Sequence, residues 1–133
     1  LSGGTILFMD DEKSIRDIAK EILEEFGFVF LPVVDGQQAI EKYNECLNKG
    51  EKVNLLILDL TIPGGMGGEE TLAEIKKIDP DVRAVVSSGY SNNQIMSEFH
   101  KYGFINYLQK PYTAQDLLSV VNNEIVPNIS ELI

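Results

Sequence analysis

The sequence predicts an open α/β sheet of five parallel strands with helices on both of its faces. Short apolar runs alternate with stretches in which apolar residues recur at helical spacing; the runs are residues 5–9, 28–34, 53–58, 82–87 and 105–108. The first, third and fourth runs are nearly continuous in apolar residues, as is typical of parallel strands covered on both faces. Because crossovers between parallel strands are right-handed, the intervening helices are expected on both faces of the sheet.

The first two helices and the strand between them carry local signals. Apolar residues line one face of the first helix, and Gly27 follows them as a C′ residue; they are Ile15, Ile18, Ala19, Ile22, Leu23 and Phe26. Pro32 in the second run cannot donate a ladder hydrogen bond, which favours an edge strand or a strand end. The second helix is expected to open at Asp35, which has capping-box spacing to Gln38, and to stop near Gly50.

Similar signals bound the other three helices. The predicted bounds are about 68–78 for the third, Ser91 to near Gly103 for the fourth, and Thr113 to before Pro127 for the fifth. The third helix should end where Asp79 precedes a proline, because that position disfavours the helical conformation. In the fifth, Thr113 and Asp116 have the spacing of a capping box.

The length and charge of the chain limit its class. With 133 residues it fits one domain, with an expected core over about residues 4–125 and a short tail over 126–133. The net charge of −10 and the scattered basic residues disfavour direct binding to nucleic acid or to an anionic membrane surface. The single cysteine, Cys46, fits a reducing compartment, and no signal peptide or membrane-spanning run is present. We therefore expect a cytoplasmic protein.

Polar side chains follow the apolar runs at the end where ligands bind in sheets of this kind. Asp10 and Asp11 follow the first run, Asp59 closes the third, Ser88 follows the fourth, and Lys110 follows the fifth. Ligands of open parallel sheets bind outside the carboxyl ends of the strands. Three carboxylates, a hydroxyl and an ammonium should therefore meet at one edge.

This combination of groups suits phosphoryl transfer. Crowded carboxylates repel one another, and a hard cation such as Mg²⁺ relieves that repulsion with oxygen ligands. Asp59 can act as a nucleophile that forms an aspartyl-phosphate. Lys110 and Ser88 can bind oxygens of the phosphoryl group.

Four segments of the chain resemble the defining motifs of response-regulator receiver domains. They are MDDE at 9–12, LDLTIP at 58–63, SSGYS at 87–91 and YLQKPY at 107–112. The resemblance implies the flavodoxin-like (βα)₅ fold with strand order 2-1-3-4-5. It also implies site roles: Asp59 as phosphoacceptor, Asp10, Asp11, Asp59 and the Thr61 carbonyl as ligands of Mg²⁺ or Mn²⁺, Lys110 and Ser88 as catalytic groups, and Ser88 and Tyr107 as switch residues.

The same resemblance implies partners and an output. A sensor histidine kinase or a histidine phosphotransfer protein would supply the phosphoryl group to Asp59. Phosphorylation would then alter a surface formed by the fourth helix, the fifth strand and the fifth helix. This surface would bind a downstream protein or support a homodimer. The chain would catalyse only its own phosphorylation and dephosphorylation, so it is not expected to be an enzyme acting on a metabolite.

The chain departs from the commonest receiver pattern after Asp59. The sequence PGGMGG at 63–68 is one residue longer and resembles receivers of hybrid sensor histidine kinases, and its glycines predict a pliable loop over 64–68. The resemblance to receivers implies that Thr61 and Tyr90 flank the path of the hydrolytic water. Neither is an acid or an amide able to orient water, so we predict a long-lived phosphoryl group.

Other readings of these residues are possible. Asp10 and Asp11 could start a helix, Tyr107 could be half-buried packing, and His100 is expected to be solvated. A Mg²⁺-dependent phosphohydrolase of the haloacid-dehalogenase type is an alternative function. It would require a second acid two residues after Asp59, where this chain has Thr61. An FMN flavodoxin would need a hydroxyl-rich loop where MDDE stands. A degenerate receiver that serves only as an interaction module is disfavoured because every chemical position is filled.

Overall fold

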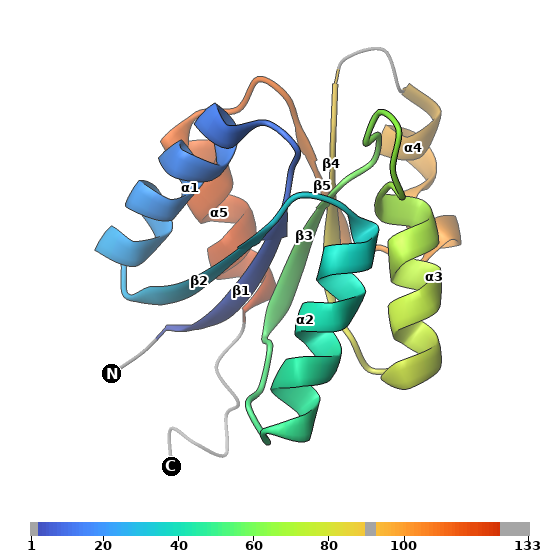
Figure 1. Cartoon of the computed structure of the whole chain (residues 1–133). Helices are drawn as coiled ribbons and strands as arrows, with labels where there is room; N and C mark the ends of the chain where they lie inside the picture. Colours follow the sequence, from blue (N-terminus) through green and yellow to red (C-terminus); the bar gives the residue numbers. More distant parts are fainter. Residues whose placement is uncertain (1–2, 90–92, 126–133) are drawn as a thin grey trace.

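A five-stranded parallel sheet forms the centre of the computed structural model, which describes residues 3–89 and 93–125 (Figure 1). Its strands are β1 (Gly4–Met9), β2 (Phe28–Val33), β3 (Leu55–Asp59), β4 (Ala84–Ser88) and β5 (Asn106–Gln109). They lie in the order β2-β1-β3-β4-β5, and every neighbouring pair is parallel. This confirms the flavodoxin-like order and places Pro32 in the edge strand β2, as predicted.

Helices cover both faces of the sheet. They are α1 (Lys13–Glu25), α2 (Gly36–Asn48), α3 (Gly68–Ile78), α4 (Asn93–Glu98) with the 3₁₀ helix η1 (Phe99–Tyr102), and α5 (Ala114–Glu124). In Figure 1, α1 and α5 lie on one side of the strands, and α2, α3 and α4 lie on the other. Across residues 3–89 and 93–125, the helices are too short or too polar to cross a lipid bilayer.

Two apolar cores fill the space between the sheet and its helices. Successive side chains of a strand point to opposite faces, so β1 sends Phe8 to the α1/α5 side and Met9 to the other side. All five residues of β3 are buried, as expected for a central parallel strand. In β3, Ile57 belongs to the α1/α5 core, and the alternation places Asp59 on the same side.

Three strands lie one or two residues further along the chain than predicted. The predicted runs 53–58, 82–87 and 105–108 correspond to β3, β4 and β5. Val53 and Val82 lie in the loops before β3 and β4, and their side chains pack against a core. The predicted runs therefore started before the strands do, because buried apolar residues also occur in these loops. The strands are held by main-chain hydrogen bonds, which do not depend on the polarity of the side chain. Each strand can therefore extend beyond its apolar run into polar residues. Asp59 and Ser88 are thus the last residues of their strands.

The apolar face of α1 is narrower than predicted. Ala19 and Leu23 are buried, but Ile18 and Phe26 are each 58% exposed. The sheet covers only part of this helix, because α1 lies beside the edge strand β2. Gly27 has a φ of 89°, which confirms its role after the C-cap residue Phe26.

The predicted capping patterns differ in how completely they form. Thr113 and Asp116 form the full capping box of α5. At α2, Asp35 accepts a hydrogen bond from the Gln38 main chain, but the Gln38 side chain accepts from Val34 rather than from Asp35. The fourth helix ends as η1 before Gly103, whose φ is 92°. Its predicted start at Ser91 lies outside the described residues.

Candidate functional site

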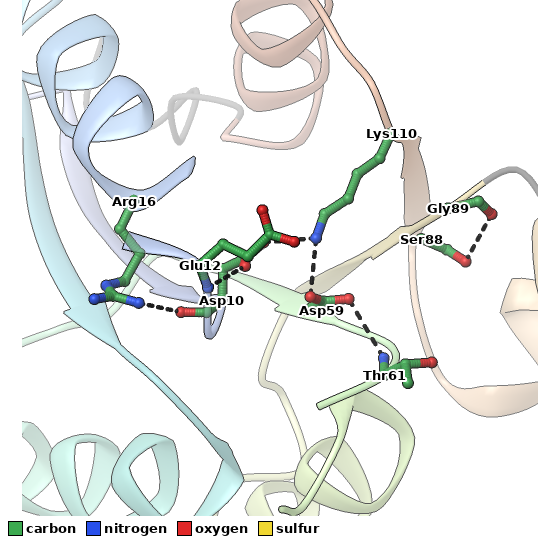
Figure 2. A network of polar contacts seen from close by, with 8 residues as sticks. All are labelled: Asp10, Glu12, Arg16, Asp59, Thr61, Ser88, Gly89 and Lys110. Atoms are coloured by element: carbon green, nitrogen blue, oxygen red, sulfur yellow. Dashed lines mark hydrogen bonds and ion pairs between the residues drawn. The ribbon is translucent and has the colours of Figure 1, made fainter. Parts of the chain in front are cut away.

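Lys110 joins two buried carboxylates at the carboxyl edge of the sheet (Figure 2). Its Nζ lies 2.7 Å from Oδ2 of Asp10 and 2.9 Å from Oδ2 of Asp59. Asp10 is 1% exposed and Asp59 is 6% exposed. The loop after β1, the end of β3 and the segment after β5 therefore bring these predicted site residues together.

Burial and pairing act in opposite directions on these groups. Burial raises the pKa of the Asp59 carboxyl above its ordinary value, although the hydrogen bond from Lys110 opposes this shift. Burial would lower the pKa of Lys110, but its bonds to Asp10 and Asp59 outweigh that effect and raise it. The ammonium therefore stays charged, and one cation is shared between two acids.

The main chain and the side chain of Asp10 are held from several directions. Its N–H donates to the Val33 carbonyl at 3.1 Å, and its own carbonyl accepts from Nη1 of Arg16 at 2.8 Å. Its Oδ1 accepts from the N–H of Glu12 at 2.9 Å. The N-cap residue of α1 is Glu12, so neither aspartate starts the helix. The alternative reading of this pair as a simple helix start is therefore wrong.

Asp11 completes a group of three carboxylates with Asp10 and Asp59. Asp11 is exposed, and one oxygen from each of the three residues lies within 4.8 Å of the others. Carboxylate oxygens at this spacing suit a hard cation of the Mg²⁺ type, which binds few protein carboxylates and keeps several waters. The donor set therefore fits the predicted metal.

Two further predicted residues lie at the edge of this group. The N–H of Thr61 donates to Oδ1 of Asp59 at 3.3 Å, and the Thr61 side chain is exposed. Ser88 is buried, and its hydroxyl donates to the carbonyl of its neighbour Gly89 at 3.2 Å. Figure 2 shows Ser88 turned toward Gly89, and β4 pairs Asp59 with Ser87 rather than with Ser88. In this structure Ser88 is near Asp59 but is not bonded to it.

The family comparison agrees with this geometry. The family model described as the response regulator receiver domain matches residues 6–122 of the chain. The chain belongs to the response regulator receiver domain family. Members of this family are phosphoacceptor signalling modules of two-component systems.

Receiver domains of several organisms resemble this one along nearly their whole length. The chain is 29% identical over 121 residues to chemotaxis protein CheY of Thermotoga maritima, covering 90% of this chain and 96% of CheY. It is 28% identical over 116 residues to sporulation initiation phosphotransferase F of Bacillus subtilis, covering 87% and 89%. The crystal structure of a response regulator receiver domain protein from Clostridium thermocellum matches with a TM-score of 0.82 and 32% identity, over 97% of this chain and 98% of that one.

Tyr107, the other predicted switch residue, packs against η1. Tyr107 is 39% exposed, and its ring centroid lies 5.5 Å from that of Phe99 in η1. His100 is exposed, as predicted, and its ring centroid lies 4.1 Å from the ring centroid of Phe99. Tyr90, proposed to tune hydrolysis, lies outside the described residues.

The glycine-rich loop after Asp59 forms main-chain hydrogen bonds with neighbouring segments. The carbonyl of Met66 accepts from the N–H of Gly36 at 2.9 Å, and Gly68 donates to the Leu60 carbonyl at 3.2 Å. A Cβ at Gly67 would lie 2.2 Å from the Leu60 oxygen. Gly67 therefore serves close packing beside the site, and the pliability of the loop remains a prediction.

Two residues near the site were not singled out from the sequence. Arg16 contacts the main chain of Asp10, and only its place in the helix after the acidic pair could have suggested this contact. Tyr112 has an enclosed hydroxyl without a hydrogen-bond partner in the described part of the chain. Burial, together with the charges of Asp10 and Asp59, raises the pKa of Tyr112.

Proposed function

We propose that this receiver accepts a phosphoryl group on Asp59 from a phospho-histidine of a sensor histidine kinase or a histidine phosphotransfer protein. The observation that carries the proposal is the position of Lys110, whose ammonium binds Asp10 and Asp59 at once. A lysine placed this way can stay beside Asp59 while the phosphoryl group is transferred, because its contact with Asp10 keeps it at the site. The exposed edge beside Asp11 leaves room for the donor.

The reaction forms one bond and breaks one. An oxygen of Asp59 attacks the phosphorus, the new oxygen–phosphorus bond forms, and the phosphorus–nitrogen bond of the phospho-histidine breaks. The imidazole leaves with the electron pair of that bond and takes up a proton. Because the product adds charge beside Asp10 and Asp11, the site needs compensating cations.

The residues of the chain divide this task between them. Asp10, Asp11, Asp59 and the carbonyl of Thr61 would hold Mg²⁺ or Mn²⁺, and the bound cation supplies charge neutralisation and alignment of phosphoryl oxygens. Lys110 keeps its contact with Asp10 and donates to a phosphoryl oxygen. The Thr61 N–H, now on Asp59, orients the attacking carboxylate.

Phosphorylation would change contacts on the surface of α4, β5 and α5. The Ser88 hydroxyl would exchange the Gly89 carbonyl for a phosphoryl oxygen, which frees the segment after β4 to move. Tyr107 is exposed and packs on Phe99, so a shift of that segment toward the site would change the packing of its ring. We propose that this surface binds the downstream protein or a second copy of the chain.

Two other functions are less well supported. A Mg²⁺-dependent phosphohydrolase needs an acid two residues after the nucleophile, and the hydroxyl of Thr61 is too weak an acid to serve as a general acid at neutral pH. A receiver that only binds partners would not need an ammonium shared between two buried acids.

We place the module in the cytoplasm, because buried Cys46 is a free thiol, as expected in a reducing compartment.

Localising the modification tests the proposed acceptor directly. The protein is incubated with acetyl phosphate and Mg²⁺, and the acyl phosphate is reduced with borohydride, which converts the modified aspartate to homoserine. Peptide mass spectrometry should find homoserine at position 59 alone. Homoserine at position 10 or 11 with Asp59 intact would show that the acceptor has been assigned to the wrong carboxylate.

A further inference from the structure

We propose that Arg16 is a positioning residue for the cation site, and that it acts by fixing the peptide between Asp10 and Asp11. The inference rests on the proposed function, because it concerns the same cation. Nη1 of Arg16 donates to the carbonyl oxygen of Asp10 at 2.8 Å (Figure 2). A peptide group is planar, so holding this carbonyl fixes the plane that leads into Asp11.

Asp11 depends on that plane more than its neighbour does. The Asp10 side chain is held by Glu12 and by Lys110. The side chain of Asp11 is exposed and makes no hydrogen bond or ion pair with the residues that the structure describes. Its direction is therefore set by its own rotamer and by the peptide that Arg16 holds.

The position of Arg16 is unfavourable for the helix itself. Arg16 lies in the first turn of α1, where the helix dipole disfavours cations, and this turn contains no acidic residue. Arg16 is half-buried, and it forms no ion pair with a carboxylate within residues 3–89 and 93–125. Its bond to the Asp10 carbonyl offsets this cost, which indicates a role in the site rather than in helix stability.

Positioning and simple electrostatics predict opposite effects on cation binding. Removing a positive charge near three carboxylates should tighten Mg²⁺ binding if charge alone matters. Removing the bond that orients Asp11 should weaken it, because outer contacts of metal ligands typically contribute tenfold or more to affinity. The sign of the change therefore separates the two explanations.

Lys13 provides a matched control in the same turn. It carries the same charge, but its side chain is 79% exposed and pairs with Asp17, away from the Asp10 carbonyl. Lys13→Met therefore removes a cation from the first turn of α1 without touching the acidic pair. Arg16→Lys keeps the charge and a donor, so it should restore part of the affinity.

The test measures Mg²⁺ dissociation constants by calorimetric titration of the unphosphorylated proteins. Arg16→Met is expected to bind about tenfold more weakly than wild type, Arg16→Lys to fall between them, and Lys13→Met to match or exceed wild type. Unchanged or tighter binding by Arg16→Met would overturn the inference.

Two controls keep the result interpretable. Thermal unfolding checks that each variant is folded, and Arg16→Gln replaces Arg16→Met in the same comparison if the methionine variant is not. Wild-type protein that binds no Mg²⁺ and gains no phosphoryl group would instead overturn the proposed function, and the inference with it. Wild-type binding with an unaffected Arg16 variant overturns the inference alone.

Discussion

Lys110 reaches Asp59 across 51 positions of sequence and binds its Oδ2 at 2.9 Å. The same ammonium lies 2.7 Å from Asp10, so the three groups form a carboxylate–ammonium–carboxylate chain. Each group comes from the carboxyl end of a different strand, or from the segment that follows it. The parallel sheet therefore builds the site, and removing one member should change the energetics of the other two.

Replacing Asp59 with asparagine should stabilise the unphosphorylated protein at neutral pH. Burial raises the pKa of Asp59 above the unfolded value near 3.8, so the folded state binds this proton more tightly than the unfolded state. The ionised group therefore lowers the free energy of unfolding once the pH exceeds the unfolded pKa. We expect the melting temperature of Asp59→Asn at pH 7.5 to exceed that of wild type by about 2–5 °C.

The pH dependence gives this prediction its control. The difference between Asp59→Asn and wild type should shrink as the pH is lowered from 7.5 toward the ordinary carboxyl pKa near 3.8, because folded wild-type Asp59 then binds its proton. Glu51→Gln removes an exposed carboxylate and should change the melting temperature little at either pH. A melting temperature of Asp59→Asn below that of wild type at pH 7.5 would contradict the predicted stabilisation.

Lys110→Met should have the opposite effect on stability. The substitution leaves Asp10 and Asp59 buried without their shared cation, and breaking a buried pair in this way costs about 3 kcal/mol. Urea unfolding without divalent cations should show this loss, and added Mg²⁺ should recover more stability in the variant than in wild type. Lys77→Met breaks the exposed pair with Glu74 and should cost far less. Equal losses from the two variants would contradict the prediction.

The receiver should release its phosphoryl group slowly, and better water-orienting side chains should speed release. Thr61 is exposed beside Asp59, and Tyr90 is the other residue expected to flank the hydrolytic water. The double variant Thr61→Asn, Tyr90→Glu should raise the dephosphorylation rate roughly tenfold or more. Decay of the phosphorylated protein, followed by intact mass after removal of the donor, measures this rate. An unchanged rate would show that these positions do not control hydrolysis.

Gly67 should be intolerant of any side chain. Its Cβ would lie 2.2 Å from the main-chain oxygen of Leu60, and a backbone atom cannot move aside as a flexible side chain can. Gly67→Ala should therefore lower the free energy of unfolding by about 1–3 kcal/mol. Gly89 also lies at the edge of the site, but a Cβ there meets nothing within 4 Å, so Gly89→Ala should be nearly neutral. Urea unfolding of the two variants makes the comparison.

The sequence predicted the parts of this receiver that depend on periodicity and on strand ends. Continuous apolar runs identified the central strands, and the rule that ligands bind at carboxyl ends predicted that Asp10, Asp59 and Lys110 meet at one edge of the sheet. The exposure of Ile18 could not be predicted, because it depends on how far the sheet extends beneath α1. Likewise, the packing role of Gly67 depends on a carbonyl from another part of the loop. The contact of Arg16 with a main-chain oxygen is suggested only by its place after the acidic pair, because residue type alone does not identify a main-chain partner.

The most direct test of the central claim is the intact mass of wild type and Asp59→Asn after incubation with acetyl phosphate, with and without Mg²⁺. We expect wild type to gain one phosphoryl group only when Mg²⁺ is present, and Asp59→Asn to gain none. The stability measurements above show separately whether the variant is folded. A gain that persists in Asp59→Asn, or no gain in wild type together with no detectable Mg²⁺ binding, would contradict the account.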